Sequence, residues 1–218
     1  MAARQARIEV FGARTGNCFR AAIALEEAGL AYEPRVVDLA HKEQRGPAFL
    51  ALNPQGKVPV LVEYEENRPA FVLSQSNAIL MHVAERSRGR LLPENDPVAR
   101  ARCYERFLFF VTDVIAPSHA AFALRRAGKD GDEAAFLDRS SVGALASSDH
   151  MLAVQPFIDG DRFTLADISA YTIALAYQES IDWRTVPHLE RWFERVGARP
   201  SVQRGLAAFN DPPERKSA

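Results

Sequence analysis

The periodicity of the chain changes once, near Arg86, and this change limits the folds open to it. Before it, short β-branched runs alternate with segments of helical spacing, beginning with a strand at 7–11 and a helix at 17–28. After it we find no convincing strand pattern, and long helical segments follow one another. With 218 residues the chain can bury a core without disulfides or a metal. The sequence therefore predicts an α/β domain followed by an all-α domain.

The expected domain boundaries follow the places where Pro, Gly and Asn gather. Residues 1–86 form the first domain, and 87–96, rich in these residues, form a linker. Residues 97–210 form the helical domain, and the polar segment 211–218 is predicted to be disordered.

In the first domain the expected order is strand, helix, strand, an irregular segment with a short helix, two strands and a helix. The later strands are expected at 32–39, 58–64 and 70–73, and a short turn joins the last two into an antiparallel hairpin. Ser76 is expected to be the N-cap of the helix that follows. A parallel strand pair with a hairpin predicts a small mixed sheet covered by helices.

The helical domain is expected to begin with a long helix at 98–126, which Pro117 can bend. Further along, Thr164 and Asp167 have the spacing of a capping box, with Asp in place of Glu. They open an apolar helix that is expected to reach about residue 178.

Composition excludes several classes of protein. The 27 Lys and Arg balance 28 Asp and Glu, so the net charge of −1 argues against nucleic-acid binding. Two cysteines, Cys18 and Cys103, indicate free thiols in a reducing compartment. No apolar run approaches the roughly 18 residues of a membrane span, and no signal peptide is recognised, so we expect a cytosolic protein without membrane contact. Five histidines lack zinc-like spacing, so no metal site is expected.

The first candidate motif is the turn between the first strand and the first helix. Thr15, Asn17 and Cys18 bring a hydroxyl, an amide and a thiol to a helix N-terminus, where an anion such as a thiolate is stabilised. Thr15 precedes the helix, so its hydroxyl is expected to point into a groove. Cys18 has helical spacing with apolar residues and is expected to be buried against the sheet, where a thiol is inert.

The second candidate motif is Lys57, Val58 and Pro59, at the start of the third strand. If the Val58–Pro59 bond is cis, the backbone of Val58 turns outward and can pair with an extended peptide ligand. The alternative is a plain X-Pro strand start with a trans bond.

The third candidate motif is Gln75 and Ser76, between the fourth strand and a helix. The unpaired N–H groups of a helix N-terminus attract carboxylates, and Ser76 adds a hydroxyl. Gln75 can bond to an amino-acid head group, although a routine N-cap explains the serine equally well.

Taken together, the motifs resemble those of the cytosolic glutathione S-transferases along nearly the whole chain, most closely the bacterial Ser/Thr-type enzymes, including those that act on disulfides. The motifs that carry the resemblance are Thr15–Cys18, Glu43-Gln44 before Pro47 and Phe49-Leu50, Asn53–Pro59, Gln75–Ile79, Gly160–Asp167, Pro187–Trp192 and Ala198–Pro200.

The resemblance implies a thioredoxin-like first domain with glutathione bound above its sheet, as co-substrate and without a metal. It assigns the cysteinyl unit to the backbone of Val58, with Pro59 cis. It assigns the γ-glutamyl head to Gln75 and Ser76, and the glycyl end to Lys57 and Gln44.

For the chemistry, the resemblance places Thr15 at the position of the catalytic hydroxyl, with Asn17 helping to polarise the sulfur. The expected enzyme activates the thiol of glutathione and transfers it to a small hydrophobic electrophile or a disulfide. The resemblance also implies a homodimer.

Two other functions remain open at this stage. Cys18 could form a mixed disulfide with glutathione, which would make the protein a glutathione-dependent disulfide oxidoreductase. Alternatively, the chain could be a non-enzymatic binding or regulatory module, since a fold does not fix a function.

Overall fold

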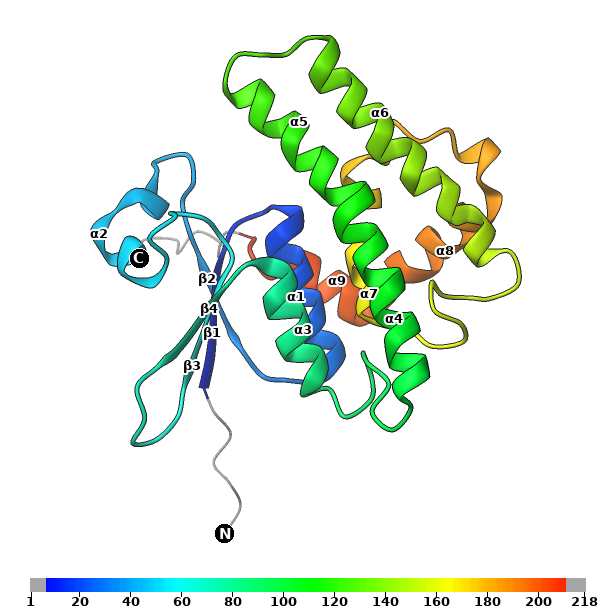
Figure 1. Cartoon of the computed structure of the whole chain (residues 1–218). Helices are drawn as coiled ribbons and strands as arrows, with labels where there is room; N and C mark the ends of the chain where they lie inside the picture. Colours follow the sequence, from blue (N-terminus) through cyan, green and yellow to red (C-terminus); the bar gives the residue numbers. More distant parts are fainter. Residues whose placement is uncertain (1–6, 211–218) are drawn as a thin grey trace, which may run out of the picture. The chain divides into compact units, whose positions relative to one another are not determined.

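A computed structural model describes residues 7–210, so the disorder predicted for 211–218 lies outside the described residues (Figure 1). By their internal contacts, the described residues form two compact units, 7–87 with 200–210, and 88–199. The elements of the first unit are β1 (Arg7–Gly12), α1 (Gly16–Ala28), β2 (Glu33–Val36), a 3₁₀ turn (Glu43–Arg45), α2 (Pro47–Leu52), β3 (Val60–Tyr64), β4 (Phe71–Ser74), α3 (Ser76–Glu85) and α9 (Pro200–Ala207).

The sheet of the first unit has the strand order β2-β1-β3-β4. β1 is parallel to β2 and antiparallel to β3, and β3 is antiparallel to β4. The predicted mixed sheet of a parallel pair and a hairpin is therefore confirmed. β2 and β3 are shorter than expected, and β3 begins only after Pro59, which has no N–H to donate to a ladder.

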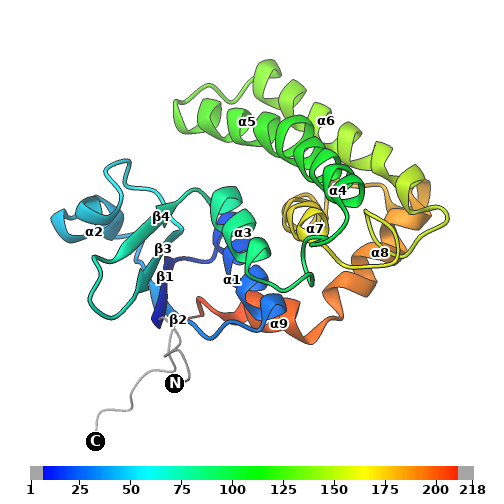
Figure 2. The same cartoon turned by 60° about the horizontal axis from the view of Figure 1, so that its bottom comes forward.

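Helices cover both faces of this sheet. Figure 2 shows α1 and α3 side by side on one face, with α2 on the other. Val62 belongs to a buried cluster that includes Phe49 of α2, and Phe11 packs against this cluster, so both face that helix. Because successive side chains of a strand point to opposite faces, Val10 and Leu61 face α1 and α3, and both are fully buried.

The helix α9 packs against α1 and belongs to the first unit. Gly205 lies so close to α1 that a Cβ would come within 2.6 Å of the Ile23 side chain. Arg204 Nε donates to Glu26 Oε2 at 2.7 Å. The division by contacts therefore differs from the expected helical domain of 97–210 at its C-terminal end, because α9 follows α1 in packing rather than its neighbours in sequence.

The second unit is helical, and its described residues contain no strand beyond the isolated bridge between Phe157 and Gly160. The fully buried Trp192 of α8 donates to Asp167, at the start of α7, at 2.8 Å. The helical elements of the unit are α4 (Pro97–Phe109), α5 (Ala116–Arg126), α6 (Asp132–Ser147), α7 (Leu165–Ala176) and α8 (Pro187–Gly197), with short 3₁₀ turns at Ser148–Leu152 and Trp183–Thr185.

The segment expected as one helix at 98–126 is continuous but not uniform. A π-helical stretch, Phe110–Ile115, joins α4 to α5. It lies just before Pro117, which cannot donate the i→i−4 bond that an α-helix would need there.

By length and composition alone, the helical segment Pro97–Arg126 could cross a membrane: an 18-residue window has a mean hydropathy of 1.6, and 28% of that window is buried. Polar residues such as Thr112, Asp113 and His119 interrupt this segment, so it contains no continuous apolar run of the length expected for a membrane span. One such helix is weak evidence for a membrane, since core helices pass the same test.

The capping box of α7 is present as predicted. The Asp167 carboxylate accepts from the N–H of Thr164 at 2.9 Å and from the N–H of Ile158 at 2.9 Å. Its side chain is fully buried, and burial raises its pKa to about 6.

Candidate functional site

Thr15 is the N-cap of α1, with an extended backbone at φ −134°. Its Oγ1 accepts from the N–H of Cys18 at 3.4 Å and donates to Cys18 Sγ at 3.1 Å. Thr15 is half-buried, and its hydroxyl already has a sulfur partner within this chain. An external thiolate must compete with Cys18 for the single hydroxyl hydrogen.

Cys18 is fully buried, as predicted. Burial raises the pKa of its thiol, and this outweighs the bonds that Sγ receives from Thr15 and from the N–H of Ala13 at 3.3 Å. A buried thiol of raised pKa is a poor nucleophile at neutral pH. The geometry therefore disfavours Cys18 as the reacting sulfur.

At the start of α3, the structure corrects the expected N-cap. Gln75, not Ser76, is the N-cap, with a positive φ of 73° and no hydrogen bond from its side chain to the helix. Ser76 is the first helical residue, and its side chain is turned inward and buried. The physical reason is a buried partner, Arg20, which takes the Ser76 hydroxyl away from the backbone of α3.

Arg20 was not among the site residues expected from the sequence. Its side chain is buried, and its Nη1 donates to Asn17 Oδ1 at 2.9 Å and to Ser76 Oγ at 2.8 Å. The guanidinium thus joins the N-termini of α1 and α3. The i,i+3 spacing from Asn17 was a local signal for the first contact. The second contact, 56 residues away in sequence, had no such signal.

The Val58–Pro59 bond is cis, which confirms the conformation implied by the resemblance. Among the residues that the structure describes, no hydrogen bond joins the backbone N–H or C=O of Val58 to another group. The Lys57 carbonyl accepts from Asn53 Nδ2 at 2.7 Å, which holds the segment, while the Lys57 side chain is exposed. Within residues 7–210, Val58 therefore offers a backbone donor and acceptor that no other group uses.

Gln44 lies in the 3₁₀ turn before α2. Its Oε1 is buried and has no hydrogen-bond partner within the described part of the chain. The turn packs closely on the loop before β3, since a Cβ at Gly56 would lie 2.8 Å from the Gln44 carbonyl oxygen. Arg45 Nη1 donates across the same contact to the Gln55 carbonyl at 3.2 Å. The structure thus brings Gln44 to the loop that carries Lys57.

The strand register brings the candidate segments to one end of the sheet. Val60, the first residue of β3, pairs with Phe11 near the end of β1 and with Ser74 at the end of β4. The loop after β1, the segment before β3 and the start of α3 therefore leave the sheet side by side. They carry, in chain order, Thr15 and Asn17, then Lys57, Val58 and Pro59, then Gln75 and Ser76.

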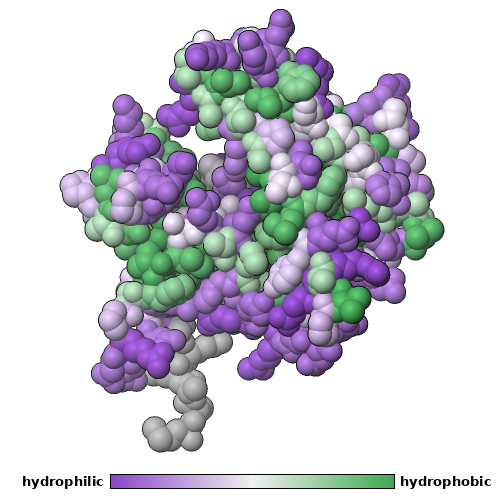
Figure 3. Space-filling view, in the orientation of Figure 1, coloured by the Kyte–Doolittle hydropathy of each residue, from purple (hydrophilic) through white to green (hydrophobic). Residues whose placement is uncertain are grey.

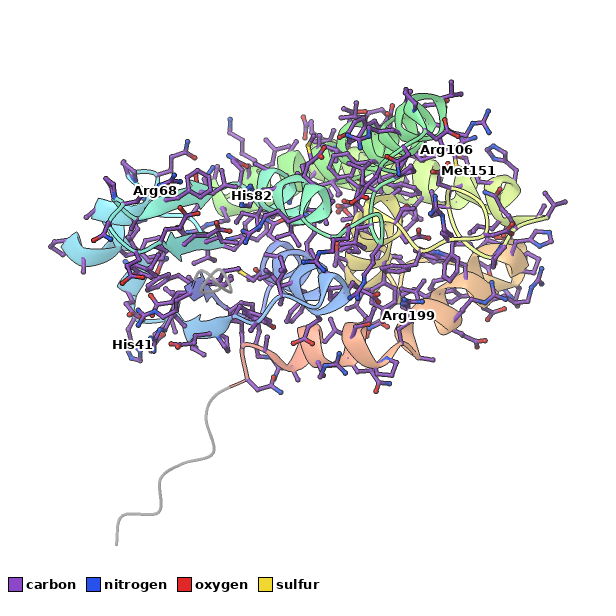
Figure 4. All side chains as sticks on the ribbon, turned by 90° about the horizontal axis from the view of Figure 1, so that it is seen from below. His41, Arg68, His82, Arg106, Met151 and Arg199 are labelled. Atoms are coloured by element: carbon purple, nitrogen blue, oxygen red, sulfur yellow. The ribbon has the colours of Figure 1, made fainter. Side chains whose placement is uncertain are left out.

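The opposite end of the β3–β4 hairpin carries charged and aromatic side chains in place of the candidate site residues. A shallow depression there is lined by Glu63, Arg68, Phe71 and His82, among others, and Figure 4 labels Arg68 and His82. His82 bonds to the buried Glu63 at 3.0 Å, and the Phe71 ring lies 5.3 Å from the His82 ring. In the part of the chain that the structure describes, no group of three or more His, Cys, Asp or Glu side chains is arranged to hold a metal.

Comparison with known proteins identifies the family of this chain. The family model "Glutathione S-transferase, N-terminal domain" matches residues 6–85, and "Glutathione S-transferase, C-terminal domain" matches residues 111–200. The chain belongs to the glutathione S-transferase family. The thioredoxin-like domain with a helical domain, expected from the sequence, is the fold of this family.

Its curated relatives cover most of both chains. Glutathione S-transferase 3 of Zea mays is 32% identical over 93% of this transferase and 94% of its own length. A maleylacetoacetate isomerase of Pseudomonas aeruginosa is 36% identical over 91% and 94%. The disulfide-bond oxidoreductase YfcG of Escherichia coli is 26% identical over 91% and 94%.

Solved structures agree with this assignment. A theta class glutathione S-transferase from Xanthomonas axonopodis pv. citri, crystallised with glutathione bound, superposes on this transferase with a TM-score of 0.76. It is 32% identical, and the match covers 91% of this chain and 96% of that one.

Proposed function

We propose that this transferase binds glutathione at the end of the sheet where β1, β3 and β4 meet, with the γ-glutamyl unit at the start of α3. The N–H groups of the first turn of α3 receive no side-chain cap from Gln75, so a ligand carboxylate can take that place. The Ser76 hydroxyl adds a donor. Gln75, exposed beside it, bonds the amino-acid head.

The rest of the tripeptide follows from the backbone of Val58. Its N–H and C=O pair with the cysteinyl unit as one more extended strand. The glycyl carboxylate then lies toward the exposed ammonium of Lys57, with Gln44 beside it. This places the thiol of the ligand near the start of α1.

In this proposal Thr15 activates the thiol. Its hydroxyl hydrogen turns from Cys18 Sγ to the sulfur of glutathione, and Asn17 adds a second polar group. A thiol has an ordinary pKa of about 8.5, and hydrogen bonds to the anion lower it. The thiolate then attacks an electrophilic carbon, so that an S–C bond forms and the leaving group departs with its electron pair.

The observation that carries the proposal is the register of Val60 with Phe11 and Ser74. It unites three chain segments that are far apart in sequence, and each supplies groups suited to one part of glutathione. A scaffold without a ligand would not need this set.

The test is calorimetry of glutathione binding by the wild type and by Ser76→Ala. Loss of a hydrogen bond to a charged group should cost about 1.5–3 kcal/mol, roughly a ten- to hundred-fold loss of affinity. Arg68→Ala, in the hairpin turn at the other end of the sheet, is the control. Wild-type affinity in Ser76→Ala would reject the γ-glutamyl assignment.

A second activity, disulfide reduction by bound glutathione, is supported by the similarity to a disulfide-bond oxidoreductase. Here the thiolate attacks a disulfide sulfur, a mixed disulfide forms and the other sulfur leaves as a thiolate. The burial of Cys18 favours glutathione over that cysteine as the attacking thiol. An acceptor screen with epoxides, haloaromatics and organic disulfides separates the activities, and binding without turnover of any acceptor would favour the regulatory module.

We further propose a cytosolic homodimer with two-fold symmetry. β4 is an edge strand, and Phe71, Val72 and Met81 on β4 and α3 are each more than a third exposed. Figure 3 shows apolar surface over this part of the sheet. Such a surface suits a second copy of the chain.

A further inference from the structure

A buried guanidinium lies between two of the residues that the proposed function assigns to glutathione. The Arg20 side chain comes from the first turns of α1 and is 2% exposed. A single nitrogen, Nη1, donates both to Asn17 Oδ1 and to Ser76 Oγ, at 2.9 and 2.8 Å. Burying a charged group costs free energy unless hydrogen bonds compensate for the lost water. The two bonds from Nη1 supply part of this compensation.

The donor character of arginine restricts what its two partners can do. A guanidinium donates hydrogen bonds and never accepts them, whereas an amide and a hydroxyl can do either. The atom of Asn17 that faces Arg20 must therefore be its oxygen, and the two N–H groups on Nδ2 point away from the guanidinium. Ser76 Oγ accepts from Arg20, so its own hydrogen is available for donation.

The present partner of that Ser76 hydrogen is weak. Ser76 Oγ donates to Asn17 Oδ1 over 3.4 Å, a long bond compared with the usual 2.7–2.8 Å between oxygens. The hydroxyl can leave this contact for a ligand anion at little cost.

We propose that Arg20 is a positioning residue that makes both Asn17 and Ser76 hydrogen-bond donors toward the anionic groups of glutathione. Asn17 then presents its amide N–H groups toward the sulfur, and Ser76 presents its O–H to the γ-glutamyl carboxylate. Arg20 itself does not touch the ligand. This inference rests on the proposed function and adds to it a residue outside the binding surface.

The charge of Arg20 persists at the pH where the enzyme would work. Burial lowers the pKa of Arg20 to about 10, and the nearby Cys18 partly opposes that shift. Arg20 is therefore protonated at neutral pH, and the direction of its hydrogen bonds is fixed there.

The experiment compares Arg20→Met with Arg20→Lys. Methionine keeps an unbranched chain but has no donor, whereas one lysine nitrogen can reach both oxygens, as Nη1 does alone in the wild type. Arg204→Met is the matched control, because Arg204 is paired with Glu26 toward the far end of α1 and lies outside the site. Glutathione affinity is measured by calorimetry, and the pKa of the bound thiol by the ultraviolet absorbance of its thiolate across pH.

We expect Arg20→Met to weaken glutathione binding about ten- to a hundred-fold, the effect of losing oriented bonds to charged groups. The pKa of the bound thiol should rise at the same time, by about one unit. Arg20→Lys should restore most of both properties, and Arg204→Met should change neither. A purely structural role would alter stability without moving the thiol pKa.

Folded Arg20→Met with wild-type affinity and thiol pKa would overturn this inference and leave the proposed site intact. If Arg20→Met fails to fold, Asn17→Ala decides, since it must raise the pKa of the bound thiol if the amide donates to the sulfur. An unchanged thiol pKa in Asn17→Ala would also overturn the inference. Failure of the wild type to bind glutathione would instead reject the proposed function itself.

Discussion

At the residue scale, two neighbours at the start of α1 meet opposite environments. Thr15 is the N-cap and half-buried, whereas Cys18 is one turn further and fully buried. Thr15 Oγ1 and Cys18 Sγ are 3.1 Å apart, so both groups lie at the same helix N-terminus. The two residues differ in burial. Burial alone therefore separates a hydroxyl that can reach a ligand from a thiol that cannot.

For these two residues we predict that Thr15→Ala lowers turnover at least tenfold, since a donor to a developing anion is worth a factor of this order. It should also move the thiol ionisation limb of the pH–rate profile to higher pH. Cys18→Ala should keep the wild-type turnover and pH profile, at a cost of about 1 kcal/mol in stability from the small cavity.

Steady-state rates across pH, with one electrophile and one disulfide as acceptors, check this. Thr15→Ser is the matched control and should retain most of the activity. Loss of turnover in Cys18→Ala, with activity kept in Thr15→Ala, would mean that the chemistry is cysteine-based.

At the element scale, the helices depend on contacts that hold their ends and their closest approaches. Asp167 caps α7 and also accepts from Trp192 of α8 at 2.8 Å, so one buried carboxylate ties two helices together. Gly205 lets α9 approach α1 until their backbones nearly touch. Both contacts should therefore affect the stability of the fold.

The buried carboxyl group of Asp167 should make the stability of the protein depend on pH. The pKa of Asp167 is about 6 in the folded protein against 3.8 normally, because burial outweighs its hydrogen bonds. Protonation therefore favours the folded state, and this contribution is full below pH 3.8 and lost as the pH rises through 6. A shift of about two units corresponds to about 3 kcal/mol.

Asp167→Asn removes this contribution. The free energy of unfolding of the wild type should therefore fall toward that of Asp167→Asn as the pH rises from 4 to 7. Urea unfolding of both proteins at several pH values measures the difference. A difference that is constant across this range would contradict the assignment.

Two helical glycines, Gly205 in α9 and Gly143 in α6, should respond in opposite ways to substitution by alanine. At Gly205 a Cβ would lie 2.6 Å from the Ile23 side chain and 2.7 Å from its backbone nitrogen, so Gly205→Ala should destabilise by about 1–3 kcal/mol. At Gly143, in α6, a Cβ would meet no atom of the described residues within 4 Å, so Gly143→Ala should stabilise by about 0.5–1 kcal/mol. Thermal unfolding of the two variants should shift in opposite directions, and equal shifts would refute the packing argument.

At the scale of the whole molecule, the proposed homodimer depends on the exposed apolar residues of β4 and α3. Sedimentation at micromolar concentration should give about 48 kDa, twice the chain mass of 24.2 kDa. Phe71→Glu should shift the protein toward the monomer, because it puts a charge into the proposed interface. Val154→Glu is the control, since Val154 is 95% exposed in the other unit. A wild type that sediments as a monomer would reject the dimer.

Most of the local structure could be predicted from short-range sequence patterns. Alternation of period two and helical spacing predicted the strands and helices of both units, and the spacing of Thr164 and Asp167 predicted the capping box. These signals are local, since each lies within a few residues of the structure it predicts. The order of strands and helices was enough to predict the mixed sheet.

How distant segments combine depends on tertiary packing and could not be predicted from short-range patterns. The register that brings Thr15, Val58 and Ser76 to one end of the sheet, and the bond from Arg20 to Ser76, join residues that no short window contains. The same holds for α9, which packs on a helix about 180 residues earlier. The burial of a side chain and the direction of its hydrogen bonds are set when elements pack against each other. The residues next to Ser76 in the sequence predicted an N-cap, but the packing of α1 on α3 makes Ser76 a hydrogen-bond partner of Arg20.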